Sequence, residues 1–370
     1  MRHLEKIGRL NRAVEFLPAD DEIAERRVAK TGLTSPERAV LLAYSKMSLY
    51  DELTASKLVD DPYVAQALSE YFPKVLTERY SDVMARHPLK REIIATVVTN
   101  TMINHVGSVF VHRMQLETGA AADEVARAYI LVRDIFGFAS LWADIEALDN
   151  RIPARVQADM LIDAGRLLLR ATLWFLRRRR EKLPIAEVLK IFRPGADKLR
   201  SELASLLNEG DLQALRAQQA RLEAAGVPAP LAERVAGADA LYAALDIVEA
   251  ASEQGVEVDL LARIYFDLAG RLELRWLAAQ IAMLPGETQW QALARNALRD
   301  DLTHQQRLIT ARVAILSPGS RDARTMIVAW LEHNILPLAR LSEMLQEFKT
   351  GPAPDLAMLS VVLRELRGLT

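Results

Sequence analysis

The 370-residue sequence contains no cysteine, which excludes disulfides, thiolate zinc sites, iron–sulfur clusters and thiol nucleophiles. It also lacks an excess of charge of either sign, since 47 Lys and Arg stand against 49 Asp and Glu. A dedicated nucleic-acid-binding protein relies on a basic face that neutralises phosphates. The formal net charge of −2 therefore argues against nucleic acid as a partner.

Motifs for cofactors and catalysis are missing as well. The sequence has no G-x-G-x-x-G after a strand pattern, no phosphate-binding G-x-x-x-x-G-K-[ST] loop, and no G-x-S-x-G, H-E-x-x-H or EF-hand pattern. Without a parallel sheet there is also no crevice in which a dinucleotide would normally bind. We therefore expect no catalytic residue, no cofactor-binding residue and no metal ligand in this chain.

Long hydrophobic runs are scarce. The opening residues 1–27 are charged throughout and lack the apolar segment of an export signal, so we expect a cytoplasmic location. The longest stretch without Asp, Glu, Lys or Arg, Ile93–His112, carries too many polar side chains for a lipid-facing span. We expect no membrane partner, and we expect this stretch to be deeply buried in protein.

Helix-forming residues dominate what is present. Alanine (55 residues) and leucine (56 residues) are the best apolar helix formers, because neither loses much rotamer freedom in a helix. Alternating β-branched and aromatic runs, which are typical of strands, are lacking. The prediction is an all-α fold, a multi-helix array of mostly antiparallel packed helices with no substantial β-sheet.

Start and stop signals place the individual helices. Thr34-Ser35-Pro36-Glu37 forms a capping box at the first firm helix start, and a long helix runs from Pro153 to the four arginines 177–180. Pro337 is expected to kink or split the last long helix, because proline lacks an N–H. The other predicted helices are 62–71, 74–86, 88–104, 107–118, 122–136, 138–149, 230–254, 257–284, 288–316 and 320–349. This pattern predicts a lead-in arm at 1–33, a first helical subdomain at 34–182 and a second at 183–370.

Few polar residues are candidates for a site. Thr96, Asn100 and Asn104 recur every four residues and predict a polar line on one helix, with His105 beside it. Either this line forms a small polar pocket, or its side chains make interhelical hydrogen bonds that fix the register. The second interpretation is favoured, because the line lacks the convergent charge that a substrate needs.

Structural roles explain the histidines and the arginine run better than metal binding or nucleic-acid binding does. His105 and His112 are seven residues apart and could share a helix face, and Asp301-x-x-His304 offers one carboxylate–histidine pair. A bundle metal site needs more ligands than these. The four arginines lack interleaved aromatics, and as a solvated helix end they complement the C-terminal dipole.

Seven segments of the sequence carry a family resemblance. They are Arg9–Pro18 (RLNRAVEFLP), Leu33–Lys46 (LTSPERAVLLAYSK), Asp61–Tyr63 (DPY), Tyr71–Pro73 (YFP), Arg91–Thr96 (REIIAT), Glu124–Tyr129 (EVARAY) and Leu141–Asn150 (LWADIEALDN). In the same order, these segments resemble the C-terminal region of the large bacterial NAD-dependent glutamate dehydrogenases. The match is specific up to about Arg180, and beyond that point it rests on general helical character.

The resemblance implies a non-catalytic structural or regulatory domain. The parent enzyme would oxidise L-glutamate to 2-oxoglutarate and ammonium with NAD, and it would be a homo-oligomer. The catalytic domain of the same polypeptide would be the partner of this chain, and no catalytic residue is carried over. Two alternatives stay open: an independent all-helical adaptor that binds a protein partner, and a small-molecule regulatory domain that uses the neighbourhood of Thr96, Asn100, Asn104 and His105.

Overall fold

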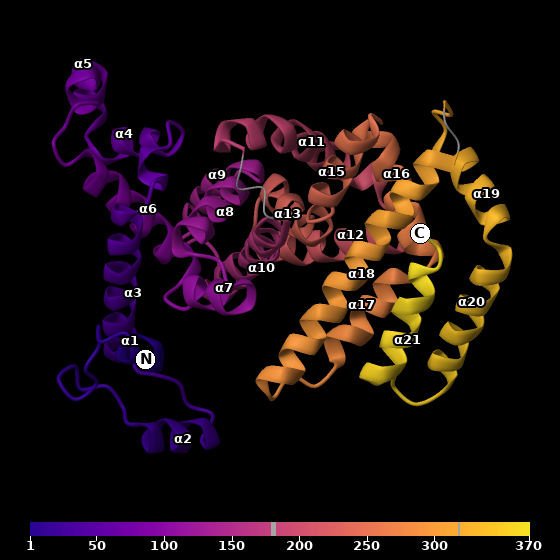
Figure 1. Ribbon diagram of the computed structural model, residues 1–370, viewed down its shortest axis with the longest axis horizontal. Helices are drawn as coiled ribbons and strands as arrows, with labels where there is room; N and C mark the ends of the chain where they lie inside the picture. Colours follow the sequence, from indigo (N-terminus) through magenta and orange to yellow (C-terminus); the bar gives the residue numbers. More distant parts are fainter. Residues whose placement is uncertain (179–182, 317–318) are drawn as a thin grey trace. The chain divides into compact units, whose positions relative to one another are not determined.

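The computed structural model describes residues 1–178, 183–316 and 319–370 (Figure 1). Every regular element in these ranges is helical, which confirms the all-α prediction. The chain forms two compact units: unit 1 is Met1–Phe138 with Gly165–Leu189, and unit 2 is Ala139–Ala164 with Lys190–Thr370. The predicted division into an arm and two subdomains remains a prediction. Of the four-arginine run, Arg179 and Arg180 lie outside the described residues.

The first part of the chain forms the helices of unit 1. They are α1 (Arg2–Lys6), α2 (Asp20–Val28), α3 (Ser35–Ala55), η1 (Leu58–Asp60), η2 (Val64–Gln66), α4 (Ala67–Tyr71), α5 (Lys74–Met84), α6 (Lys90–Val106), α7 (Phe110–Thr118) and α8 (Ala122–Ile135). Helix α3 packs against α6 and α8, and α4 also packs against α6. Residues 1–33 fold onto α3, because Leu4, Leu10 and Leu17 form a small buried cluster with Leu41 and Tyr44.

Helix α3 begins with the predicted capping box. The Thr34 hydroxyl accepts from the Glu37 backbone N–H at 3.4 Å, and a Glu37 carboxylate oxygen accepts from the Thr34 N–H at 2.6 Å. Glu37 also accepts from the Arg26 guanidinium of α2 at 2.8 Å. One carboxylate therefore caps α3 and joins it to α2.

Glu37 is expected to make this junction sensitive to acid. Its hydrogen bond to Arg26, and then that to the Thr34 N–H, lower the pKa of Glu37 from 4.5 to about 2. Since the folded-state pKa is the lower one, the stabilisation is present above pH 4.5 and is lost as the pH falls towards 2. The Glu37→Gln variant should thus melt at a lower temperature than wild type at pH 6, and the two melting temperatures should converge near pH 2. A difference that stays constant with pH would contradict this assignment.

The expectation that Ile93–His112 is deeply buried throughout is wrong. Helix α6 ends at Val106, and Gly107 adopts a positive φ of 81° before α7 begins. Ile94 and Met102 lie on the buried face of α6, whereas Asn100 and Asn104 are exposed. Asn100 and Asn104 thus lie on the outer face of α6, whereas the polar Thr99 is buried. In the described part of the chain no single helix has the length and hydropathy to cross a membrane, and α6 and α7, bent by 88°, meet those criteria only when taken together.

Three of the later helices contain residues of both units, and the others belong to unit 2 alone. Those three are α9 (Phe138–Glu146), α10 (Ala154–Arg178) and α11 (Ile185–Leu206). They are followed by α12 (Glu209–Ala224), α13 (Ala229–Ala236), α14 (Ala238–Leu241), α15 (Ala244–Gln254), α16 (Val258–Arg271), α17 (Leu274–Met283), α18 (Gln289–Leu316), α19 (Ala323–His333), α20 (Ile335–Thr350) and α21 (Leu356–Arg367).

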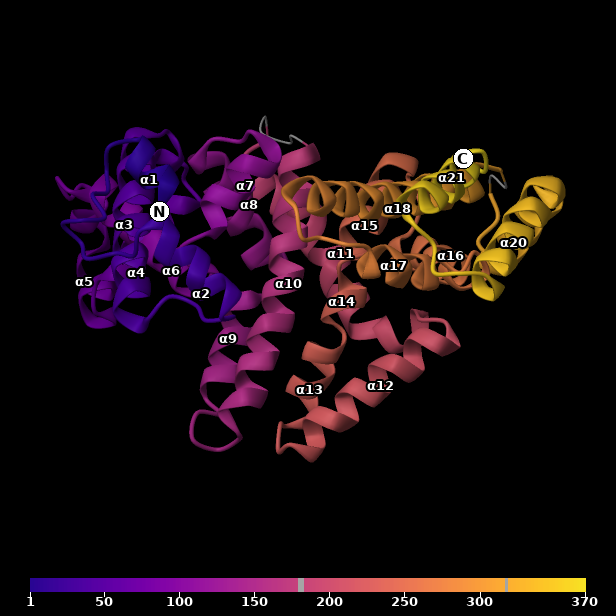
Figure 2. The ribbon, with the colours of Figure 1, turned by 90° about the horizontal axis from the view of Figure 1, so that it is seen from below.

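Helix α18 is the central element of unit 2. It packs against α15, α16, α17, α19 and α21, and Figure 1 shows it running beside α17 and α21. Its inner face carries Leu302, Ile309 and Val313, which are buried and spaced by seven and four residues. Helices α12 and α13 form a separate hairpin (Figure 2).

Two predicted helices of unit 2 are broken. The 230–254 segment breaks at Gly237, where a Cβ would meet Leu203 of α11 at 2.8 Å, and again at residues 242–243, between α14 and α15. The 257–284 segment breaks at Glu273, which adopts a left-handed φ of 53°. That break lets both α16 and α17 pack against α18. The split predicted at Pro337 is confirmed, because α19 ends at His333 and α20 begins at Ile335.

Candidate functional site

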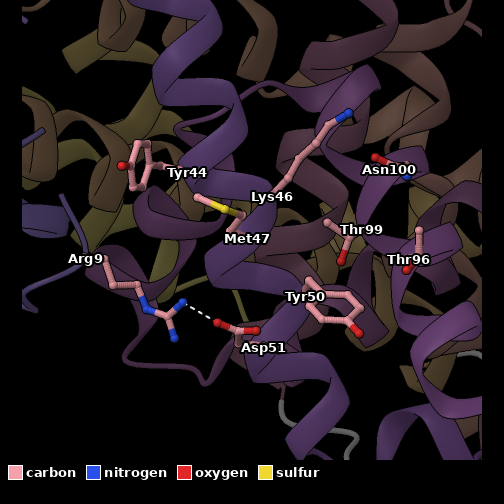
Figure 3. A pocket seen from close by; sticks show the side chains of 9 residues that line it. All are labelled: Arg9, Tyr44, Lys46, Met47, Tyr50, Asp51, Thr96, Thr99 and Asn100. Carbon is pink, nitrogen blue, oxygen red and sulfur yellow. Dashed lines mark hydrogen bonds and ion pairs between the residues drawn. The ribbon is translucent and has the colours of Figure 1, made fainter. Parts of the chain in front are cut away.

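A groove between α3 and α6 is the candidate site in unit 1. Its volume is about 480 Å³, which lies within the range of small-molecule sites. The lining comprises one residue of the N-terminal segment, five residues of α3 and three of α6 (Figure 3). These residues are Arg9, Tyr44, Lys46, Met47, Tyr50, Asp51, Thr96, Thr99 and Asn100.

Helical spacing brings the lining residues together. On α6, Thr96, Thr99 and Asn100 follow the i, i+3, i+4 spacing that places side chains on one face. On α3, Lys46 and Tyr50 are four residues apart and follow the same rule. Because α3 and α6 pack directly against each other, these two faces meet at the groove.

Some lining side chains already have partners. Arg9 forms an ion pair with Asp51, shown by the dashed line in Figure 3. The Tyr44 hydroxyl donates to the Glu15 carboxylate at 2.6 Å, and this hydrogen bond raises the pKa of Tyr44 because it favours the protonated phenol. The Thr96 hydroxyl donates to the Glu92 carbonyl at 2.7 Å. These contacts hold the walls of the groove in place.

Two other side chains have no partner. The Thr99 side chain is only 2% exposed, and among the described residues its hydroxyl has no hydrogen-bond partner. Lys46 is half-buried, and its ammonium forms no ion pair or hydrogen bond with any residue that the structure describes. A buried hydroxyl and a half-buried cation normally find partners. The Thr99 hydroxyl oxygen has less than 1 Å² of accessible surface, so the groove offers only the positive charge of Lys46 as a group that the chain itself leaves unpaired.

The predicted polar line divides in the structure. Thr96 and Asn100 line the groove, whereas Asn104 and His105 lie further along α6, exposed and outside the lining. The His105 Nδ1 is 2.6 Å from the Thr101 carbonyl. The assumption that the line is buried is wrong at Asn100 and Asn104, which are exposed. The interpretation that buried amides at these two positions fix the helix register is therefore not supported. The pocket interpretation stays a prediction.

The two histidines that were expected to share a helix face lie on different helices. His105 lies on α6 and His112 on α7, so the two do not share a helix face. His112 instead stacks on His3, with ring centroids 4.2 Å apart, and burial lowers the pKa of His112. Asp301 forms an ion pair with Arg367 of α21 at 2.5 Å. Within the described ranges, no group of three or more His, Asp or Glu side chains is arranged to hold a metal ion.

Fold and groove together define the class of the protein as an all-helical domain with a small groove between two of its helices. Comparison with known families then makes the assignment specific. The family described as "Glutamate dehydrogenase, C-terminal" matches residues 30–368, and the chain belongs to this family.

Curated relatives agree with this assignment. The chain is similar to the NAD-specific glutamate dehydrogenases of Pseudomonas aeruginosa (41% identity over 369 residues, all of this chain), Halomonas elongata (38%, over 98% of the chain) and Mycobacterium tuberculosis (31%, over 98% of the chain). It spans only 22–23% of the length of these relatives. The chain therefore corresponds to the C-terminal part of large NAD-specific glutamate dehydrogenases.

Proposed function

We propose that this chain is the non-catalytic C-terminal domain of a large NAD-dependent glutamate dehydrogenase. The full-length enzyme would oxidatively deaminate L-glutamate to 2-oxoglutarate and ammonium, with NAD as the hydride acceptor. The observation that carries the proposal is the match to the C-terminal family over residues 30–368, in relatives more than four times as long. The rest of the same polypeptide would bind NAD and glutamate.

The architecture supports an accessory role. Dinucleotides commonly bind where strand ends and helix N-termini meet at the edge of a parallel sheet. The described residues contain helices only. A packed helical domain with a groove on its surface is suited to support or regulate a catalytic domain. We further propose that the parent enzyme is a cytoplasmic homo-oligomer and that this chain has no nucleic-acid or membrane partner.

A direct assay tests the non-catalytic role. The purified 370-residue chain, mixed with L-glutamate and NAD, is expected to give no increase in NADH absorbance, because the proposal assigns NAD binding to the rest of the polypeptide. The full-length polypeptide under the same conditions is the positive control and should turn over. Sustained NADH formation by the chain alone, proportional to its concentration, would overturn the proposal.

A further inference from the structure

We propose that residues 1–33, the N-terminal segment, dock this domain onto the part of the parent polypeptide that comes before them, and that the Phe16 ring inserts into an apolar pocket of that preceding part. The inference rests on the proposed function, because it requires a larger enzyme around the chain. Three observations carry it: the exposure of Phe16, the backbone conformation of Phe16 and the length of the relatives.

The N-terminal segment has an inner and an outer set of apolar side chains. The inner set, Leu4, Leu10 and Leu17, is buried against α3. The outer set is exposed to solvent and comprises Ile7, Val14, Phe16 and Val28. Phe16 is 91% exposed, more than any other large apolar side chain among the described residues. Its ring therefore contributes no burial to the stability of the domain itself.

The backbone of Phe16 is strained. Its φ is 51°, in the left-handed region that glycine enters at little cost and that residues with a Cβ avoid. The Leu17 N–H donates to the Arg12 carbonyl at 2.9 Å and closes the turn in which Phe16 takes this conformation. Glycine is the usual residue at such a position. The chain thus has a strained phenylalanine here, although it does not bury the ring.

Contacts on both sides of Phe16 fix the turn. The Glu15 carboxylate accepts from the Tyr44 hydroxyl of α3 at 2.6 Å, and the Arg12 guanidinium pairs with the Asp20 carboxylate at 2.8 Å. The ring is therefore presented from a backbone that is already ordered. A preorganised aromatic side chain loses little conformational entropy when it enters a pocket, and such side chains commonly anchor interfaces.

The length of the relatives points to what covers the ring. The chain aligns along its whole length with a relative more than four times as long. The match to the C-terminal family begins only at residue 30, so residues 1–29 align with the relative but lie outside the family region. In such a polypeptide the N-terminal segment continues directly into the preceding part. That part is the occupant we propose, and a second copy of this chain is the alternative.

Photo-crosslinking in the full-length polypeptide identifies what the ring contacts. Phe16 is replaced by p-benzoylphenylalanine, and the cross-linked peptides are mapped by mass spectrometry. The expected cross-link joins position 16 to the preceding part, in a product that keeps the mass of one polypeptide in denaturing electrophoresis. A product of twice that mass would show that a second copy covers the ring. That product, a cross-link confined to residues 1–370, or no cross-link would each overturn the proposal.

The variant Phe16→Gly tests the docking thermodynamically, because it should have opposite effects in the two polypeptides. In the isolated 370-residue chain it should increase the hydrogen-exchange protection of the Leu17 amide about threefold or more, because the left-handed backbone is no longer strained. In the full-length polypeptide it should decrease the protection of the same amide, because the docked ring is lost.

Lys30→Gly is the matched control. Lys30 is exposed and has a φ of 54°, and the Thr31 N–H donates to the Arg26 carbonyl at 2.8 Å in a turn of the same kind. This variant relieves the same strain without removing an apolar ring, so it should increase the protection of the Thr31 amide in both polypeptides.

An increase in protection for Phe16→Gly in the full-length polypeptide, like that of the control, would contradict the docking. Neither measurement involves glutamate turnover. If the docking fails while the isolated chain gives no NADH, the proposed function stands and only this inference is lost.

Discussion

Replacing Arg307 with methionine is expected to lower the free energy of unfolding of unit 2 by about 3–5 kcal/mol. Arg307 lies on the central helix α18 and is only 8% exposed. Its guanidinium is 3.5 Å from the carboxylate of Glu249 and 3.4 Å from that of Glu253, both on α15. Glu249 is itself 3% exposed, so loss of the arginine leaves a buried negative charge without this cation.

This loss is measured by unfolding in urea, monitored through the hydrogen exchange of the α15 and α18 amides. The double variant Arg307→Met with Glu249→Gln should recover part of the stability, because the buried carboxylate is removed together with its cation. Arg340→Met is the matched control, since the Arg340–Glu365 pair at 3.1 Å has a largely exposed arginine and should contribute at most about 1 kcal/mol. Equal losses in the two arginine variants would contradict the role assigned to Arg307.

Local signals explain which parts of the fold could be predicted. The capping box at Thr34 and Glu37 and the split before Pro337 each depend on residues within one helical turn. Such signals act on the backbone directly, so they can be found in the sequence. The overall all-α class follows in the same way from an Ala- and Leu-rich composition that favours helix everywhere.

The breaks at Gly237 and Glu273 could not be predicted, because distant parts of the chain set them. At Gly237 a Cβ would lie 2.8 Å from the Leu203 side chain of α11, and the approach of that side chain has no mark in the sequence near residue 237. Glu273 accepts a left-handed conformation although glutamate favours helix, and the gain is that Leu272 and Leu274 are both buried. Tertiary packing overrides local propensity at both positions.

The candidate site shows the same limit. The four-residue spacing of Thr96 and Asn100 identifies one wall of the groove, and Asn104 and His105 extend that pattern beyond it. Lys46 comes from α3, about fifty residues earlier, and its place opposite α6 depends on how the two helices pack. Periodicity reveals which residues share one helix face, but it does not reveal which other helix covers that face.

Trp330→Ala is the second change with a large expected effect, a loss of about 3–5 kcal/mol. Trp330 is 0% exposed on α19, which packs against α16 and α18. Truncation to alanine removes a large aromatic surface and leaves a cavity that close-packed helices refill only partly. Urea unfolding monitored by circular dichroism measures the loss as a lower transition midpoint.

Two comparisons separate the packing of Trp330 from its polar group. Among the described residues the indole N–H of Trp330 has no hydrogen-bond partner, so Trp330→Phe removes a buried unsatisfied donor and keeps most of the apolar volume. Its cost should therefore be well below that of Trp330→Ala. Trp290 is 81% exposed, and Trp290→Ala should change the stability by no more than about 0.5 kcal/mol. If Trp330→Phe lowered the stability as much as Trp330→Ala, the loss could not be assigned to the packing of the ring. The indole N–H would then have to make a stabilising interaction of its own.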